Sequence, residues 1–168
     1  MVEAAADHAI VIDEAYVQFA STDLLDLVRP GSPVIVTRTF SKTWGLAGLR
    51  LGYAIADPEI VEALDLVCLP YHVDSLKQIA GEVALGHVVA MDARVEETVA
   101  ERERIRAGLV SLGLAVVPSE ANFLLFETGE CPAGELWSAL VDRGVLVRDC
   151  SGWPGLAGRD RKSTRLNS

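Results

Sequence analysis

The sequence predicts an α/β protein in two parts. The first is a portion of a large domain with a mostly parallel sheet and helices, and the second is a small α+β domain. Short apolar runs alternate with helical patterns through residues 1–90, as in sheets covered on both faces. A long helical pattern over residues 91–112 would link the domains. After Gly113 the pattern changes to short strands around one helix.

Three apolar runs in the first part predict strands. Residues 9–12 are entirely apolar, which is typical of a strand buried on both faces. Residues 33–37 and 51–56 form the second and third runs. A short helix is expected over residues 24–28, and the pair Pro30-Gly31 should end it.

Two helices are predicted after the third strand. Asp57 is the expected N-cap and Pro58 the first helical residue, where a missing N–H costs nothing. This helix should end near Pro70, and a second helix is expected over residues 74–85. The first helix carries its apolar residues on one face: Ile60, Val61, Leu64 and Val67.

The linking helix over residues 91–112 is rich in glutamate and arginine. This pattern favours a solvated face crossed by i,i+4 ion pairs, and a partner-binding seam is the alternative. The small domain is expected over residues 113–158. Its predicted strands and helix cover residues 115–117, 122–126, 133–141 (the helix) and 145–147.

Residues 159–168 hold four of the 15 basic residues but one of the 24 acidic ones. This switch of charge predicts a disordered or non-native tail, and a genuine solvated terminus is the alternative. Because the first strand begins almost at Met1, we expect a fragment that lacks sequence at both ends.

The composition excludes several functional classes. A net charge of -9 argues against nucleic-acid binding. The odd number of cysteines and the scattered histidines predict neither disulfides nor a metal site, but free thiols in a reducing cytosol. We find no signal peptide and no apolar run approaching the roughly 20 residues of a membrane helix. A soluble, cytoplasmic protein is therefore expected.

The candidate catalytic residue is Lys42, which follows the second predicted strand and lies between two aromatic residues. A lone lysine in a loop would more simply be a surface residue. Arg50, however, offers a rigid fork of donors suited to phosphate, and Thr39 and Ser41 add hydroxyls. This spacing predicts a site that holds a phosphorylated aldehyde cofactor through an imine with Lys42.

Asp13 ends the first predicted strand, where ligands of open α/β sheets bind. A pyridoxal ring needs a carboxylate partner to keep its nitrogen protonated, and Asp13 suits that role. A loop aspartate that caps the next turn is the alternative. Tyr16 could donate to the ring hydroxyl, and Glu14 is interpreted as structural.

These segments resemble the pyridoxal-phosphate aminotransferases of the aspartate-aminotransferase superfamily. Within that superfamily, the more detailed resemblance is to the histidinol-phosphate aminotransferase family. The resemblance rests on residues 13–16, 39–42 and 45–53 and extends to later segments, so that it covers about residues 8–158. It implies a partial large domain of fold type I, with the C-terminal part of the cofactor-binding domain over residues 1–90.

The resemblance also implies roles. Lys42 would be the Schiff-base lysine and proton shuttle. Pyridoxal 5'-phosphate would further contact Asp13, Tyr16, Thr39, Ser41 and Arg50. Three residues would face the substrate: Arg148 near its phosphate, Asn122 near the active-site wall, and Arg161 at the substrate carboxylate. The implied reaction moves an amino group between L-histidinol phosphate and 2-oxoglutarate in a homodimer.

The family's Asn-Pro-x-x-Pro-Thr-Gly segment, its glycine-rich phosphate loop and its ring-stacking aromatic residue would lie before Met1. We therefore expect this chain to be impaired and poorly soluble. An aromatic amino-acid aminotransferase and a phosphate-substrate decarboxylase are alternatives within the enzyme class. A catalytically silent remnant, which only dimerises or binds cofactor weakly, is the alternative outside it.

Overall fold

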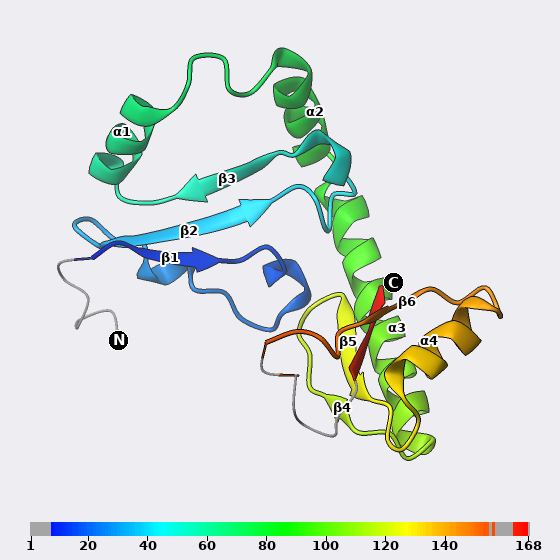
Figure 1. Ribbon diagram of the computed structural model, residues 1–168. Coiled ribbons are helices and arrows are strands. Elements are labelled where there is room, and N and C mark those ends of the chain that lie inside the picture. The colour runs from blue at the N-terminus through cyan, green and yellow to red at the C-terminus, as the bar shows by residue number, and fades with distance from the viewer. Residues whose placement is uncertain (1–7, 155, 157–162, 168) are drawn as a thin grey trace. The chain divides into compact units, whose positions relative to one another are not determined.

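The computed structural model describes residues 8–154, 156 and 163–167 (Figure 1). The chain forms two compact units, Met1–Val95 and Glu96–Ser168. Within the described part of the chain, none of the helices is both long and apolar enough to cross a bilayer.

The first unit is built on a three-stranded sheet in the order β1-β2-β3. Strand β1 (Ile10–Asp13) is parallel to β2 (Val34–Thr39), with Asp13 opposite Thr37. Strand β3 (Gly52–Ile55) is antiparallel to β2 and places Gly52 opposite Thr39. The carboxyl ends of β1 and β2 therefore lie at the same edge of the sheet.

The core of this unit follows the two-residue period of β2. Val34 and Val36 are completely buried, and Phe40 continues the same face beyond the strand. The Phe40 ring packs against Trp44 and Tyr53, with centroids 5.7 and 5.8 Å away. Gly81 permits a close approach nearby, because a Cβ there would lie 2.8 Å from Leu51 Cδ2.

Helices α1 (Pro58–Val67) and α2 (Ser75–Leu85) follow β3, and three short 3-10 helices precede them: Val17–Phe19, Leu25–Leu27 and Ala47–Leu49. The predicted cap of α1 is confirmed. Asp57 Oδ1 accepts the Glu59 N–H at 2.9 Å, and Oδ2 accepts the Gly31 N–H at 2.8 Å. The helix expected over residues 24–28 is a single 3-10 turn.

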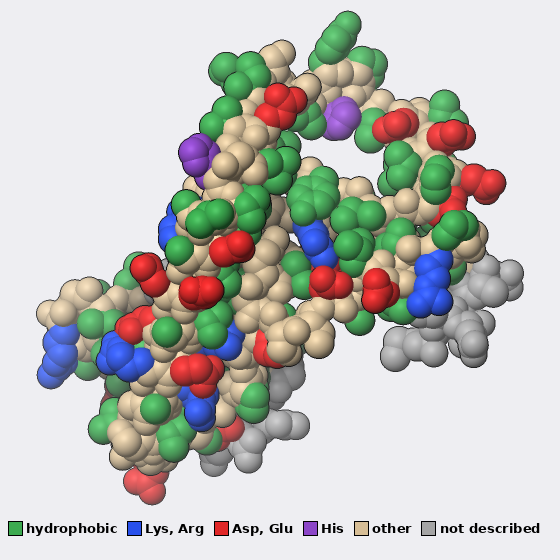
Figure 2. All heavy atoms as spheres, turned by 180° about the vertical axis from the view of Figure 1, so that it is seen from behind, with side chains coloured by type: hydrophobic (Ala, Val, Ile, Leu, Met, Phe, Trp, Pro, Cys, Tyr) green, Lys and Arg blue, Asp and Glu red, His purple; other side chains and the backbone are tan. Residues whose placement is uncertain are grey.

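The expectation that residues 9–12 form a strand buried on both faces is wrong, because Val11 is 63% exposed on β1, an edge strand of the described sheet. On α1, Val67 is 77% exposed. Among the residues of α1, none is buried. The apolar pattern is present in both elements, but the described chain supplies no cover for these faces. Hydrophobic side chains accordingly reach the surface on the face shown in Figure 2.

Helix α3 (Val88–Ser111) runs from the first unit into the second. Its charged residues pair at a spacing of three instead of the expected four: Glu101 with Arg104, and Glu103 with Arg106. Hydrogen bonds from these arginines lower the pKa values of the two glutamates. The ion pairs lie on the exposed part of the helix, as a solvated face requires.

The second unit contains helix α4 (Ala133–Val141) and an antiparallel sheet in the order β4-β5-β7-β6. The strands are Val116–Val117 (β4), Phe123–Glu127 (β5), Val147–Asp149 (β6) and Ser163–Asn167 (β7). Its core includes Leu124, Phe126, Ala133, Val147 and Cys150.

Residues 163–167, which lie in the tail predicted to be disordered or non-native, form strand β7. Its backbone pairs with β5 from Phe123 to Glu127 and with β6 from Val147 to Asp149. Composition and charge missed this strand because its hydrogen bonds come from two neighbouring strands and not from a local pattern. Residues 159–162 and 168 lie outside the described residues.

Candidate active site

The predicted cofactor residues gather at the edge of the first sheet where β1 and β2 end. Asp13 is the last residue of β1, and Lys42 lies three residues after the end of β2. Because the two strands are parallel neighbours, the segments that follow them emerge on the same side of the sheet.

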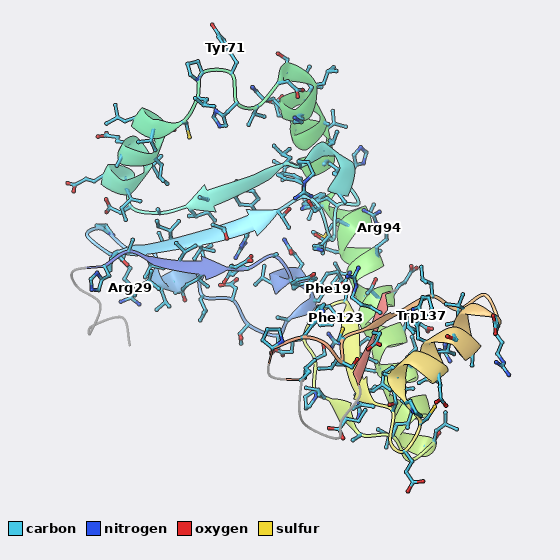
Figure 3. The ribbon with its side chains drawn as sticks, in the orientation of Figure 1. Phe19, Arg29, Tyr71, Arg94, Phe123 and Trp137 are labelled. Atoms are coloured by element: carbon cyan, nitrogen blue, oxygen red, sulfur yellow. The ribbon has the colours of Figure 1, made fainter. Side chains whose placement is uncertain are left out.

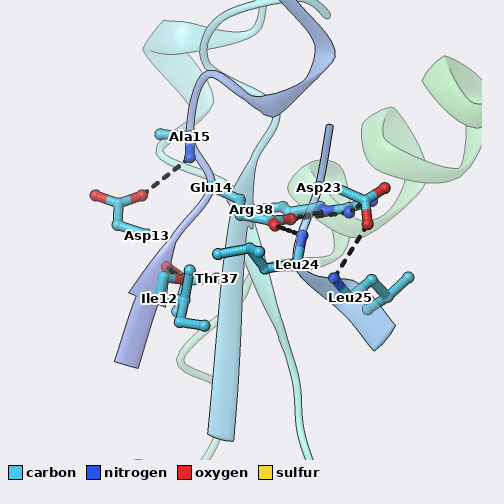
Figure 4. Close-up of polar contacts among 9 residues, drawn as sticks. All are labelled: Ile12, Asp13, Glu14, Ala15, Asp23, Leu24, Leu25, Thr37 and Arg38. Atoms are coloured by element: carbon cyan, nitrogen blue, oxygen red, sulfur yellow. Dashed lines mark hydrogen bonds and ion pairs between the residues drawn. The ribbon is translucent and has the colours of Figure 1, made fainter. Parts of the chain in front are cut away.

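Asp13 is exposed, and its Oδ1 accepts the Ala15 N–H at 3.0 Å (Figure 4). The turn-capping alternative is therefore realised in the structure. This contact uses one carboxylate oxygen and leaves the group accessible to solvent, so capping and ligand binding are compatible.

Lys42 and Tyr16 come together although 26 positions separate them in the sequence. The Lys42 Nζ lies 4.9 Å from the centroid of the Tyr16 ring, within the range of a cation–π contact. The lysine is exposed and Tyr16 is half-buried. The phenol thus supports the amine from one side, and solvent reaches it from another.

Thr39 and Ser41 form a pair of hydroxyls beside the same loop. Their side-chain oxygens are 3.0 Å apart, and Thr39 Oγ1 also accepts the Ser41 N–H at 3.1 Å. The Thr39 hydroxyl lies 3.2 Å from the Leu51 carbonyl, which links this pair to the residue after Arg50.

Arg50 ends the short helix Ala47–Leu49 in the left-handed region, with φ 52° and ψ 44°. This conformation is uncommon outside glycine, asparagine and aspartate, and it occurs where the surrounding structure enforces it. The exposed guanidinium donates to the Ala47 carbonyl at 3.2 Å and retains further N–H donors.

Sequence reasoning missed Arg38, which pairs with Glu14 beneath the site (Figure 4). Arg38 Nη2 lies 2.8 Å from Glu14 Oε2, and Glu14 Oε1 accepts the Leu24 N–H at 2.7 Å. Burial disfavours the arginine charge, but the Glu14 carboxylate outweighs it and raises the pKa of Arg38. Glu14 is structural, as interpreted. Its position in the sequence could have revealed it, because Arg38 follows Val34 and Val36 at the two-residue period of the buried face of β2.

Arg94 on α3 is a second residue that the sequence did not single out. Its Nη2 donates to the Thr43 carbonyl at 3.1 Å, next to Lys42. A contact across 51 positions has no local signal.

The candidate substrate residues belong to the second unit. Arg148 is exposed on β6 and lines a pocket of about 430 Å³ with Trp137, Leu146, Val147 and Asp149. The Trp137 indole donates to the Val147 carbonyl at 3.1 Å. Asn122 is half-buried directly before β5, and Arg161 lies outside the described residues.

Comparison with known proteins matches residues 1–167 to the family described as aminotransferase class I and II. The chain is 45% identical over 148 residues to histidinol-phosphate aminotransferase 1 of Carboxydothermus hydrogenoformans, covering 88% of this chain and 42% of the relative. It is 45% identical over 147 residues to the Streptomyces avermitilis histidinol-phosphate aminotransferase, covering 87% and 39%. The chain thus spans about two fifths of the length of these curated relatives.

One solved structure carries a ligand relevant to the site. The histidinol-phosphate aminotransferase of Sinorhizobium meliloti, in complex with pyridoxal-5'-phosphate, matches with a TM-score of 0.81 and 27% identity. The match covers 96% of this chain and 45% of that protein. These comparisons confirm the predicted α/β fold class and the resemblance read from the motifs.

Proposed function

Because the chain belongs to the class I and II aminotransferases, we propose that Lys42 is its cofactor lysine and that pyridoxal 5'-phosphate is the cofactor. The observation that carries this proposal is the placement of the Lys42 amine against Tyr16, beyond the parallel ends of β1 and β2. A lysine in an ordinary surface loop would have no reason to meet the phenol that follows the neighbouring strand.

The chemistry of the donor set fits this cofactor. A phosphate needs several hydrogen-bond donors, and the hydroxyls of Thr39 and Ser41 lie 3.0 Å apart near the guanidinium-bearing turn at Arg50. A protonated ring nitrogen needs a carboxylate, which Asp13 offers at the strand end. The Tyr16 phenol can donate to a ring hydroxyl.

Pyridoxal phosphate, when bound, supplies an aldehyde and an electron-withdrawing ring. The chain's own residues would do the rest. Lys42 Nζ would hold the cofactor covalently and, as a free amine, carry a proton to and from the α-carbon of the substrate. Asp13 would hold the ring nitrogen in its protonated form. Thr39, Ser41 and Arg50 would fix the phosphate.

For the whole protein we propose amino transfer between L-histidinol phosphate and 2-oxoglutarate, in histidine biosynthesis, by a cytoplasmic homodimer. The names of the 45% identical relatives support the amino donor. The pocket at Arg148 supports the proposal that the substrate carries an anionic group, because a guanidinium can form a bidentate contact with phosphate. Asn122 and Arg161 would complete the substrate side.

A donor assay tests this proposal. The purified chain is loaded with pyridoxal phosphate, and glutamate formed from 2-oxoglutarate is measured with L-histidinol phosphate or L-phenylalanine as donor. We expect slow formation that favours histidinol phosphate and disappears in Lys42→Ala but not in Lys77→Ala. A preference for phenylalanine would favour the aromatic alternative, and no glutamate with either donor would favour a silent remnant.

A further inference from the structure

We propose that Arg94 is a positioning residue for Lys42. From helix α3 it holds the backbone carbonyl of Thr43, the residue directly after the candidate lysine. The inference rests on the proposed function, because it assigns Arg94 a part in presenting the cofactor lysine. Figure 3 labels Arg94 on α3.

The Arg94 guanidinium contacts the loop that carries Lys42 at two places. Arg94 Nη2 donates to the Thr43 carbonyl at 3.1 Å, and Arg94 Nη1 lies 3.5 Å from the place that a Cβ on Gly45 would occupy. The guanidinium therefore spans the loop from Thr43 to Gly45. A hydrogen bond from a charged donor is stronger than one between neutral groups, so this contact restrains the loop effectively.

The loop itself is a tight turn that leaves the Thr43 carbonyl in need of an external partner. The Gly45 N–H donates to the Lys42 carbonyl at 3.3 Å, and the Leu46 N–H donates to the Phe40 carbonyl at 3.1 Å. Gly45 has φ +69°, which favours glycine. These bonds occupy the carbonyls of Phe40 and Lys42, both before Thr43, and Arg94 satisfies the carbonyl of Thr43 itself.

Thr43 is the anchor through which Arg94 can act on Lys42. Its side chain is only 5% exposed, whereas the adjacent Lys42 side chain is exposed. Within the described residues, Thr43 Oγ1 has no hydrogen-bond partner. Polar fixation of Thr43 therefore depends on its backbone, and the Arg94 contact determines how firmly Lys42 is held at the Tyr16 ring.

Labelling of the three lysines tests this role, since Lys42, Lys77 and Lys162 are the only lysines in the chain. Each variant is exposed briefly to pyridoxal phosphate, reduced with borohydride and digested. The ratio of the Lys42 adduct to the Lys77 adduct is then measured by peptide mass. Arg94→Met keeps the apolar stem and removes the donors. Arg94→Lys keeps one donor, which suffices for one carbonyl.

We expect the ratio to fall about tenfold in Arg94→Met, the change that corresponds to losing one hydrogen bond to a charged group. Arg94→Lys should restore at least half of the wild-type ratio. Arg104→Met is the matched control, because Arg104 is on the same helix, pairs only with Glu101 within the described part of the chain, and is 72% exposed. It should leave the ratio unchanged.

An unchanged ratio in Arg94→Met would overturn the inference. A lower ratio that Arg94→Lys does not restore, together with a lower melting temperature, would also overturn it and assign Arg94 a structural role. A wild-type chain that shows no preference for Lys42 would instead refute the proposed function. Labelling of the wild type alone reveals this result, so the two failures are distinguishable.

Discussion

Asp13 and Glu14 are adjacent acids at the end of β1 that take different roles because only one of them is buried. Glu14 lies against Arg38 at 2.8 Å and has little exposed surface, whereas Asp13 is exposed and accepts one backbone N–H. The buried acid holds the segment in place, and the exposed one remains available to a ligand. The difference in burial therefore gives the two neighbouring acids different roles, structural for Glu14 and ligand-binding for Asp13.

The substitution Glu14→Gln should lower the free energy of unfolding by about 2 kcal/mol, because it leaves the partly buried Arg38 charge with only the longer contact to Asp23 at 3.6 Å. The matched change Asp13→Asn should cost less than about 0.5 kcal/mol, as for other exposed sites. Urea denaturation measures both. Equal losses of stability would contradict the structural role of Glu14.

The role of Asp13 is tested separately by pyridoxal phosphate binding. Unaltered binding in Asp13→Asn would contradict that role.

The Tyr16 ring should position the Lys42 side chain independently of its hydroxyl. Removing a contact worth about 0.5–1 kcal/mol leaves this side chain less well placed, so Tyr16→Leu should slow adduct formation at Lys42 by roughly two- to fivefold through lost positioning, even though the cation–π contact itself favours the unreactive ammonium form. Tyr16→Phe keeps the ring and should stay closer to wild type in this step. Tyr71→Leu is the control, because Tyr71 is 97% exposed between α1 and α2 (Figure 3). Equal rates in Tyr16→Leu and wild type would refute the contact.

At the scale of elements, Asp57 joins two parts of the first unit. One oxygen caps α1 at Glu59, and the other holds the Gly31 N–H in the turn before β2. Asp57→Ala should lower the free energy of unfolding by about 1–2 kcal/mol, because both contacts are lost. Asp57→Asn keeps an accepting oxygen for the cap and should cost less. A loss in Asp57→Ala no larger than in Asp57→Asn would contradict this account.

Helix α2 should lose stability in acid through its cap, Asp74. Its hydrogen bond with Lys77 lowers the pKa of the Asp74 carboxyl below its ordinary value of 3.8. The ionised form is therefore favoured in the folded chain, so its contribution is complete above the unfolded pKa and is lost as pH falls through the folded one.

Asp74→Asn removes this titration while keeping a capping side chain. The free energy of unfolding is measured for wild type and Asp74→Asn by urea denaturation at pH 6 and pH 3. The advantage of wild type over Asp74→Asn should be smaller at pH 3 than at pH 6. A difference that does not change with pH would refute the role of the Asp74 charge.

Local signals in the sequence predicted elements well where the physical cause is local. The pair Asp57-Pro58 determines where α1 begins, and the helix expected over residues 133–141 is α4 with the same bounds. The candidate cofactor residues were proposed because their types and spacing suit a phosphorylated aldehyde cofactor. Strand β7 and the contacts of Arg38 and Arg94 were missed, because they depend on partners far away in the sequence.

At the scale of the whole molecule, the first unit carries several large apolar side chains at its surface. Leu66, Leu69 and Leu76 are between 76% and 87% exposed around α1 and α2, and Figure 2 shows many hydrophobic side chains at the surface. The chain spans about two fifths of its curated relatives. Apolar patches of this kind promote association.

We therefore expect the chain to self-associate at micromolar concentration. Replacing Leu66, Leu69 and Leu76 by lysine should raise the soluble concentration, whereas lysine at the charged, exposed position Glu103 on α3 should not. Light scattering and thermal melting measure this. A wild-type sample that is monodisperse and melts cooperatively would contradict the expectation.

We propose above all that this chain retains a site that selects Lys42 for pyridoxal phosphate. The most direct test is to mix the wild-type chain with the cofactor, reduce with borohydride and locate the adduct by peptide mass. We predict one dominant adduct on Lys42, with Lys77 and Lys162 labelled far less. No adduct, or comparable labelling of all three lysines, would contradict it.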